Sequence, residues 1–160
     1  MTLRNIVGIS ALSLVIALAF SGAASAQDKD AAMIGYRQHL MQSIGLHAAG
    51  MGMILKGEWP YKEDAAAHAK ALAADSMLIV NAFKAQTADV KTDAKPEIWK
   101  EWSKFEDKAK GLQTEAAALA KVAESGDAAA IGGQMKKVGE ACGACHKEFR
   151  KPKEQSYKNM

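Results

Sequence analysis

The sequence is poor in cysteine, proline and aromatic residues. Its 160 residues include 2 cysteines, 3 prolines and 6% aromatic side chains. Two cysteines exclude a disulfide scaffold, and so few prolines, with 24% charged residues, argue against a long disordered or collagen-like chain. A formal net charge of +3 gives no case for a nucleic-acid partner. Length and composition predict one helical domain, whose alanine- and methionine-rich core leaves room for a group that is not a side chain.

The first segment is typical of a secretory signal peptide. Arg4 gives a positively charged start, residues 6–20 form an apolar run, and the small residues at 24–26 suit a signal peptidase. The alternative is a retained membrane anchor, but the run is shorter than the ~20 apolar residues that a spanning helix needs. We therefore expect a signal peptide at residues 1–26, a mature domain at residues 27–160, and export to the periplasm.

Helical periodicity follows in four stretches of the mature chain. Apolar residues recur at spacings of three and four from about residue 29 to 56, from 65 to 83, from 96 to 123, and from 127 to a break at Pro152. One apolar stripe per helix and short connections predict an all-α fold, an antiparallel up-down-up-down four-helix bundle. In that topology the first helix begins beside the end of the last, so that Met41 and His146 can face each other.

The motif Cys142-Gly143-Ala144-Cys145-His146 carries the chemistry of the chain. C-x-x-C-H is the pattern for attaching a c-type haem, because each thiol can add to a haem vinyl group while the next imidazole reaches the iron. On a helix these side chains are neighbours on one face. We expect one haem c, covalently bound through Cys142 and Cys145, with His146 as an iron ligand.

Other interpretations of the same motif are less well supported. A thioredoxin-like dithiol belongs to a βαβ context, and the sequence shows no strand pattern. A structural zinc site needs four ligands, whereas His39, His47 and His68 are scattered over other positions. A disulfide between residues three apart on a continuing helix would be strained.

Further motifs accompany C-x-x-C-H, which lies in the last predicted helix. They are Tyr36-Arg37-Gln38, Lys56-Gly57-Glu58-Trp59-Pro60-Tyr61, Lys95-Pro96-Glu97-Ile98-Trp99 and Cys142-x-x-Cys145-His146-x-x-Phe149-Arg150. Together they resemble the cytochrome c prime family, the class II c-type cytochromes, over essentially the whole mature chain. The resemblance implies a four-helix bundle that holds haem between its helices at one end.

Within that family the sixth coordination position of the iron divides the members. Those that leave it empty place an apolar residue four positions after the arginine of the first helix, and their high-spin haem binds nitric oxide or carbon monoxide. Low-spin relatives place methionine there. Met41 stands four positions after Arg37, so the chain resembles the low-spin, Met-ligated cytochrome c-556 type. Most buried methionines only fill a core, and the rival ligand His47 points about 120° away from Met41 around the helix.

Three further residues are candidates for contacts with the haem. A guanidinium can form two parallel hydrogen bonds to a carboxylate, and a side-chain amide can donate one. Arg37 and Gln38 are therefore candidates for hydrogen bonds to the haem propionates. The alternative is a solvated pair, and it is the resemblance that favours the contact. Arg150, one turn beyond His146, is expected beside the proximal side of the haem.

We interpret the chain as a periplasmic electron carrier, not an enzyme, with His146 and Met41 as iron ligands and protein redox partners. The alternative is a high-spin protein that binds nitric oxide or carbon monoxide at an open distal site. A basic cluster at the haem-bearing end could steer an acidic partner, although such runs are usually solvated faces. This basic cluster consists of Lys136, Lys137, Lys147, Arg150, Lys151 and Lys153. The sequence leaves open whether the protein is a monomer or a homodimer.

Overall fold

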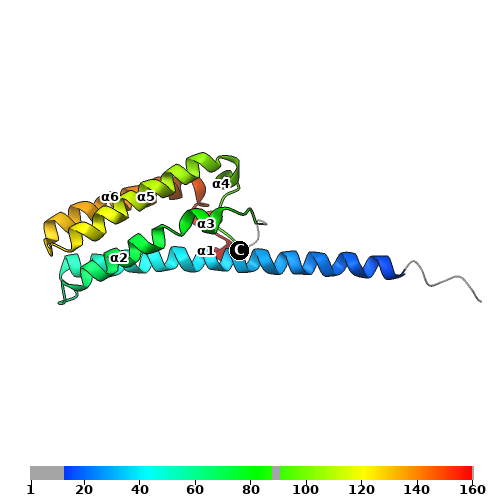
Figure 1. Cartoon of the computed structure of the whole chain (residues 1–160), viewed down its shortest axis with the longest axis horizontal. Coiled ribbons are helices and arrows are strands. Elements are labelled where there is room, and N and C mark those ends of the chain that lie inside the picture. The colour runs from blue at the N-terminus through cyan, green and yellow to red at the C-terminus, as the bar shows by residue number, and fades with distance from the viewer. Residues whose placement is uncertain (1–12, 88–90, 160) are drawn as a thin grey trace, which may run out of the picture.

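The computed structural model of the chain describes residues 13–87 and 91–159, and of residues 13–26 only the backbone. The helices are α1 (Ser13–Lys56), α2 (Asp64–Ser76), α3 (Ile79–Phe83), α4 (Glu97–Lys100), α5 (Trp102–Ala123) and α6 (Ala128–Phe149) (Figure 1). Two 3-10 turns follow, η1 (Lys153–Gln155) and η2 (Tyr157–Asn159). Within the described ranges there is no strand, and an isolated bridge pairs Ala94 with Arg150.

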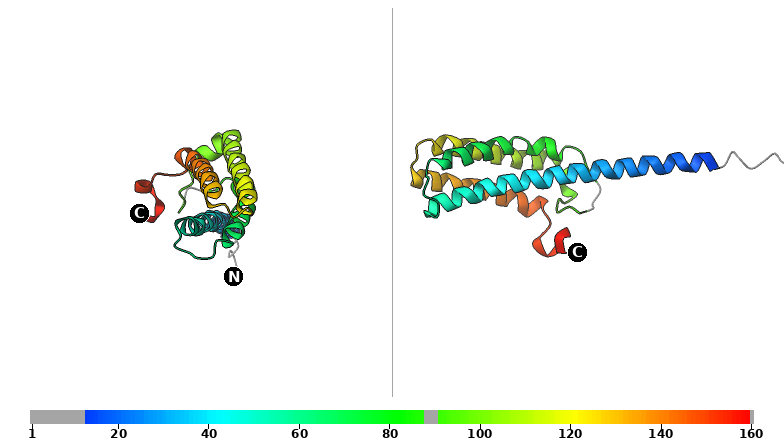
Figure 2. Two further views of the ribbon diagram at one scale, coloured as in Figure 1. Left: turned by 90° about the vertical axis from the view of Figure 1, so that its left-hand side faces the viewer. Right: turned by 90° about the horizontal axis from the view of Figure 1, so that it is seen from below.

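The predicted antiparallel four-helix bundle is confirmed. Its four rods are α1, the α2–α3 segment, α5 and α6, which lie alongside one another in both side views and surround a common core in the end view (Figures 1 and 2). Contacts are extensive between α1 and α2, between α2 and α5, and between α5 and α6, but few between α1 and α6. The bundle therefore has three closed seams and one open seam, which lies between α1 and α6.

The core is built from the apolar stripes that the sequence shows. Its largest fully buried apolar side chains are Met51, Leu72, Ile98, Leu119 and Val138. Burying a side chain of this size stabilises a fold by ~1.5–3 kcal/mol, so the stripes supply most of the free energy that holds the helices together. Small residues on the same stripes are buried too, and their size lets neighbouring helix backbones approach closely.

Two helix ends follow local sequence rules and lie where the sequence predicts them. Gly57, directly after α1, has a φ of 77°, and Gly126, after α5, has a φ of 68°; both are left-handed conformations that glycine adopts without strain. Asp127 caps α6, because its carboxylate accepts hydrogen bonds from the backbone N–H groups of Ala129 (2.9 Å) and Ala130 (3.2 Å).

The predictions of continuous helices over 65–83 and 96–123 were wrong. The first is interrupted between Ser76 and Ile79, where the Ser76 hydroxyl donates to the backbone oxygen of Ala73 (2.7 Å), a bond that bends helices. The second is interrupted at Glu101, whose φ of −116° and ψ of 44° are not helical. Apolar spacing continues across both interruptions, so the periodicity carries no sign of them.

Helix α1 begins earlier than the predicted residue 29. It starts at Ser13 and extends well past the end of the bundle (Figure 1). This start overlaps the predicted signal peptide, of which residues 1–12 lie outside the described residues, and cleavage after residue 26 stays a prediction. None of the helices that the structure describes combines the length and apolar character needed to cross a membrane.

Candidate functional site

A cavity of about 740 Å³ lies along the open seam between α1 and α6. Ligand and cofactor sites in proteins span roughly 300–1,000 Å³, so the cavity can hold a large group. Its walls are mainly apolar, and they include Ile44, Leu72, Ile79, Phe83, Ile98, Phe105, Leu112, Val138 and Phe149. The room in the core that the composition suggests is therefore present.

The C-x-x-C-H motif lies on the last turns of α6 and faces this cavity. Cys142, Cys145 and His146 all line it, and both cysteines are free and half-buried. Burial raises the pKa of the Cys142 thiol and raises that of Cys145 to about 11. The pKa of His146 is lowered by desolvation and by the charge of Arg150. The helix thus presents two thiols and an imidazole to one space, as the spacing predicts.

These residues fit a covalently bound haem c. The cavity offers apolar walls for a flat porphyrin, and the two thiols and the imidazole supply the attachment points and a nitrogen ligand on one wall. No cluster of three or more histidine, cysteine or acidic side chains suited to a metal ion occurs in the part of the chain that the structure describes.

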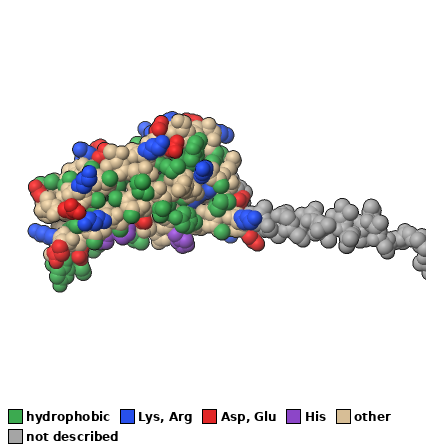
Figure 3. Space-filling model, in the orientation of Figure 1, with side chains coloured by type: hydrophobic (Ala, Val, Ile, Leu, Met, Phe, Trp, Pro, Cys, Tyr) green, Lys and Arg blue, Asp and Glu red, His purple; other side chains and the backbone are tan. Residues whose placement is uncertain are grey.

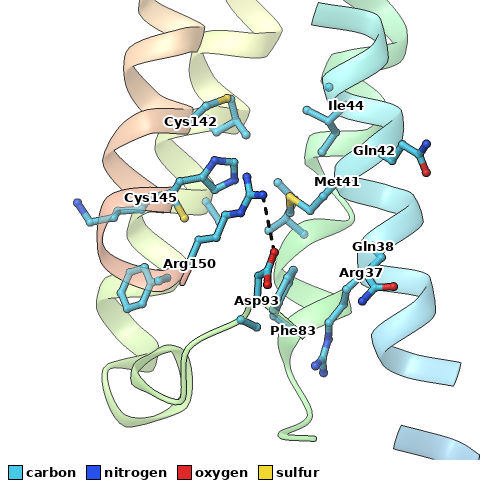
Figure 4. A pocket seen from close by; sticks show the side chains of 18 of the residues that line it. Arg37, Gln38, Met41, Gln42, Ile44, Phe83, Asp93, Cys142, Cys145 and Arg150 are labelled. Atoms are coloured by element: carbon cyan, nitrogen blue, oxygen red, sulfur yellow. Dashed lines mark ion pairs between the residues drawn. The ribbon is translucent and has the colours of Figure 1, made fainter. Parts of the chain in front are cut away.

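Met41 lies on the opposite wall. It comes from α1, is half-buried against the core, and lines the same cavity as His146. Figure 4 shows Met41 on the α1 side of the cavity, across from Cys142 and Cys145. The juxtaposition of the beginning of the first bundle helix and the end of the last, expected from topology, is confirmed. That Met41 binds the iron stays a prediction.

Arg37 is held by the protein itself. Arg37 as a whole is 3% exposed, and burial lowers its pKa. Nε donates to the backbone oxygen of Ala82 (2.7 Å), Nη1 to Oγ1 of Thr87 (2.9 Å) and Nη2 to the backbone oxygen of Ala85 (2.5 Å). Arg37 therefore ties α1 to the end of α3. The contact between Arg37 and a haem propionate remains a prediction. Only the guanidinium N–H groups that do not take part in these three hydrogen bonds could make it.

Gln38 and Arg150 also line the cavity, from opposite sides. The Gln38 amide donates to the backbone oxygen of Lys91 (2.8 Å), in the loop after α3. Arg150 is 58% exposed and its Nη2 lies 3.8 Å from a carboxylate oxygen of Asp93. Both are placed to meet a group in the cavity, and their predicted haem contacts stay predictions.

The other histidines separate into two environments. His47 and His68 face each other between α1 and α2, with their Nδ1 atoms 3.1 Å apart, and neither lines the cavity. His39 lies two residues before Met41, and a helix would turn it away from the side that Met41 faces. It is exposed, yet it still contributes to the lining of the cavity. Figure 3 shows histidine side chains at the surface along the edge formed by α1 and α2.

Sequence reasoning missed the wall formed by the loop before α4 and by the C-terminal segment. Asp93, Tyr157 and Lys158 line the cavity, although the sequence patterns assign none of these three residues to the site. Lys108 on α5 lines it too and pairs with Glu148 (2.9 Å). No local pattern marks these residues, because they reach the cavity through contacts between distant parts of the chain.

Comparisons with known proteins agree with this geometry. A profile of the family described as "Cytochrome C'" matches residues 32–150. A cytochrome c′ from Rhodospirillum rubrum is 36% identical over 140 residues, covering 87% of this chain and 95% of that protein. A cytochrome c-556 from Agrobacterium tumefaciens is also 36% identical, covering 69% of this chain and 88% of that protein.

Two known structures are similar along nearly their whole length. A cytochrome c prime from Shewanella frigidimarina superimposes with a TM-score of 0.72 at 31% identity, covering 77% of this chain and 97% of that one. A nitric oxide complex of a variant cytochrome c prime from Alcaligenes xylosoxidans gives a TM-score of 0.71 at 30% identity, covering 78% and 97%.

Proposed function

Because the chain belongs to the cytochrome c′ family of electron-transfer haem proteins, we propose that it is a low-spin electron carrier whose iron is bound by His146 and Met41. Haem c, attached through Cys142 and Cys145, supplies the change between ferrous and ferric iron. The chain provides the apolar cavity, the two thiols, the imidazole and the thioether. A His/Met ligand pair raises the reduction potential of a haem, which suits electron transfer.

One observation carries this proposal: Met41 and His146 line a single cavity from its two sides. The thioether of methionine is a weak donor that serves as an axial ligand when a protein holds it close to the iron. Met41 is half-buried against the core, so its position is defined by packing. The similarity to a cytochrome c-556 also supports a methionine-ligated iron.

The walls of the cavity have a second role. Apolar side chains from α1, α2, α5 and α6 surround the space, among them Ile44, Leu72, Leu112 and Val138. They exclude water from a bound haem, and a low-dielectric surrounding disfavours the more highly charged ferric state. Burial and methionine ligation therefore act in the same direction on the potential.

A second candidate is a high-spin protein that binds nitric oxide or carbon monoxide at an open distal site. The comparisons favour this candidate over the first, because several relatives are named cytochrome c′ and similar structures include nitric oxide complexes of a cytochrome c prime. In this case Met41 remains a side chain of the cavity wall, or leaves the iron when a gas binds.

Optical spectra of the reduced holoprotein, recorded before and after adding carbon monoxide, distinguish the two candidates. A low-spin spectrum that carbon monoxide does not change supports the carrier. A high-spin spectrum, or a new band on adding the gas, supports the gas-binding protein and contradicts stable ligation by Met41.

The variant Met41→Leu tests the ligand directly. Leucine nearly conserves the volume of the side chain but lacks the sulfur, so the fold is retained while the sixth ligand is lost. We expect the variant to become high-spin and to bind carbon monoxide. Met135→Leu is the matched control, since Met135 is a second half-buried methionine in the cavity wall. If Met41→Leu and the parent protein have the same spectrum, Met41 is not the ligand.

We further propose that the protein works in the periplasm with protein redox partners and catalyses no reaction of its own. The apolar run at residues 6–20 supports export. The basic cluster supports an acidic partner. It belongs to α6 and the residues that follow, as the C-x-x-C-H motif does, so a partner that binds these basic side chains would dock on the helix that carries the haem attachment site. Export is checked by locating the mature protein and sequencing its N-terminus, which is expected at residue 27.

A further inference from the structure

The segment after α6 is docked against the loop that precedes α4. Its backbone N–H at Lys151 donates to the backbone oxygen of Asp93 (2.7 Å). Farther along, the Ser156 hydroxyl and the backbone N–H of Tyr157 donate to the two carboxylate oxygens of Asp93, each at 3.1 Å. Ser156 is buried as a result. One aspartate therefore fixes both the start and the end of this C-terminal segment, residues 151–159.

The docked segment forms part of the cavity wall. Tyr157 and Lys158 line the cavity, whereas the match to the family profile ends at residue 150. Tyr157 is half-buried, and Lys158 is exposed. The ammonium group of Lys158 lies 6.0 Å from the centroid of the Tyr157 ring, a distance at which ring and cation attract each other weakly. The segment thus places a lysine at the opening of the cavity.

The other permanent cations of the cavity wall already have partners. Arg37 makes three hydrogen bonds within the protein. Lys108 pairs with Glu148 at 2.9 Å, and Arg150 lies 3.8 Å from Asp93. Lys158 has no carboxylate partner among the residues that the structure describes. Among these four cations, Lys158 is therefore the one whose charge no carboxylate or hydrogen-bond acceptor of the described residues already engages.

We propose that the C-terminal segment is part of the haem site and that Lys158 binds a propionate of the haem. The propionates are the two anionic groups of haem, and an exposed ammonium in the wall of a mainly apolar cavity is suited to pair with one of them. Asp93 positions the segment, and the Tyr157 ring restricts the lysine. This inference rests on covalent haem attachment but not on ligation by Met41.

Lys158→Met tests the contact through the reduction potential of the full-length holoprotein. Removing a cation beside the haem favours the ferric state, so the midpoint potential falls. A charged contact at an exposed site corresponds to about a two- to fivefold change in an equilibrium constant, or ~20–40 mV for one electron. Lys158→Arg keeps the charge and is expected to keep the parent potential. A spectroelectrochemical titration measures both variants.

Lys153→Met is the matched control, because Lys153 lies on the same segment and is exposed but does not line the cavity. Its potential is expected to stay near that of the parent. If Lys158→Met and Lys153→Met shift the potential equally, the propionate contact is wrong. The spin state read from the same spectra reports on Met41 separately, so a failure of either proposal is recognisable.

Limited trypsin digestion tests the docking. Asp93→Asn weakens the acceptors that hold Ser156 and Tyr157, so cleavage after Lys153 is expected to be several times faster than in the parent. Asp107→Asn, which changes an exposed aspartate on α5, is the control and is expected to leave the rate unchanged. Equal release of the segment from the Asp93→Asn variant and the parent, measured by mass spectrometry, would overturn the docked arrangement.

Discussion

Replacing Arg37 with methionine removes the polar clamp between α1 and the end of α3. Arg37 is a buried residue, and each of the three nitrogens of its guanidinium donates a hydrogen bond. It also lies 5.0 Å from the ring centroid of Phe83 and 5.4 Å from that of Trp99, so its charge rests on two aromatic faces. Methionine retains an unbranched apolar stem but none of these interactions.

The size of the effect follows from the acceptors that are left behind. Two backbone oxygens and one hydroxyl lose their donor. An unpaired group that is fully buried costs ~1–3 kcal/mol, which applies to the Thr87 hydroxyl, whereas the oxygens of Ala82 and Ala85 are only partly buried and regain water at a smaller cost. Part of this cost is offset because the buried guanidinium no longer has to be stripped of water. We therefore expect Arg37→Met to lower the free energy of unfolding by ~2–3 kcal/mol.

Urea unfolding of the holoprotein, followed by circular dichroism, measures this loss. Arg150→Met is the control. Arg150 also lines the cavity, but its side chain is 58% exposed and its ion pair with Asp93 is long, at 3.8 Å. Such surface pairs contribute ~0–1 kcal/mol. If Arg37→Met lowers the free energy of unfolding by no more than Arg150→Met does, the clamp does not hold the two elements together.

Three further predictions concern other parts of the molecule. In Gly50→Ala the new Cβ would lie 2.8 Å from two ring atoms of His68, so thermal melts should show a loss of ~1–3 kcal/mol. Gly52→Ala, on the same helix and outside the cavity wall, meets nothing within 4 Å and should cost nothing. Asp127→Ala should lower the free energy of unfolding of the holoprotein by ~1 kcal/mol through loss of the α6 cap, and Asp127→Ser should restore most of it; equal losses in urea would refute the cap. Electron exchange with an acidic redox protein should slow as ionic strength rises, and a stopped-flow rate indifferent to salt would remove any role for the basic cluster in steering.

The bundle and the centre of its site could be predicted from local sequence patterns. Spacings of three and four define a helix face because a helix turns about 100° per residue, and the same rule places Cys142, Cys145 and His146 side by side. The shared cavity of Met41 and His146 then follows from antiparallel topology alone. Each of these inferences needs only residues close in sequence plus one packing rule.

What the sequence could not predict depends on contacts between distant residues. The partners of Arg37 lie 45 to 50 positions along the chain, and those of the C-terminal segment lie 63 and 64 positions away on Asp93. No local pattern marks such pairs. The breaks at Ser76 and Glu101 have a different, local origin: the Ser76 hydroxyl bonds to the backbone oxygen of Ala73, and Glu101 has a non-helical backbone, while the apolar spacing continues across both.

The open seam between α1 and α6 makes the prosthetic group a component of the core. Three seams have extensive contacts between helices, whereas the fourth has few and borders the cavity that a bound haem would fill. Without haem the apolar walls face water, which costs about 25 cal/mol for each Å² exposed. Attachment of haem at Cys142 and Cys145 would therefore cover these apolar walls and stabilise the bundle. We expect a chain that loses either thiol to be defective in stability and lifetime, and not only in electron transfer.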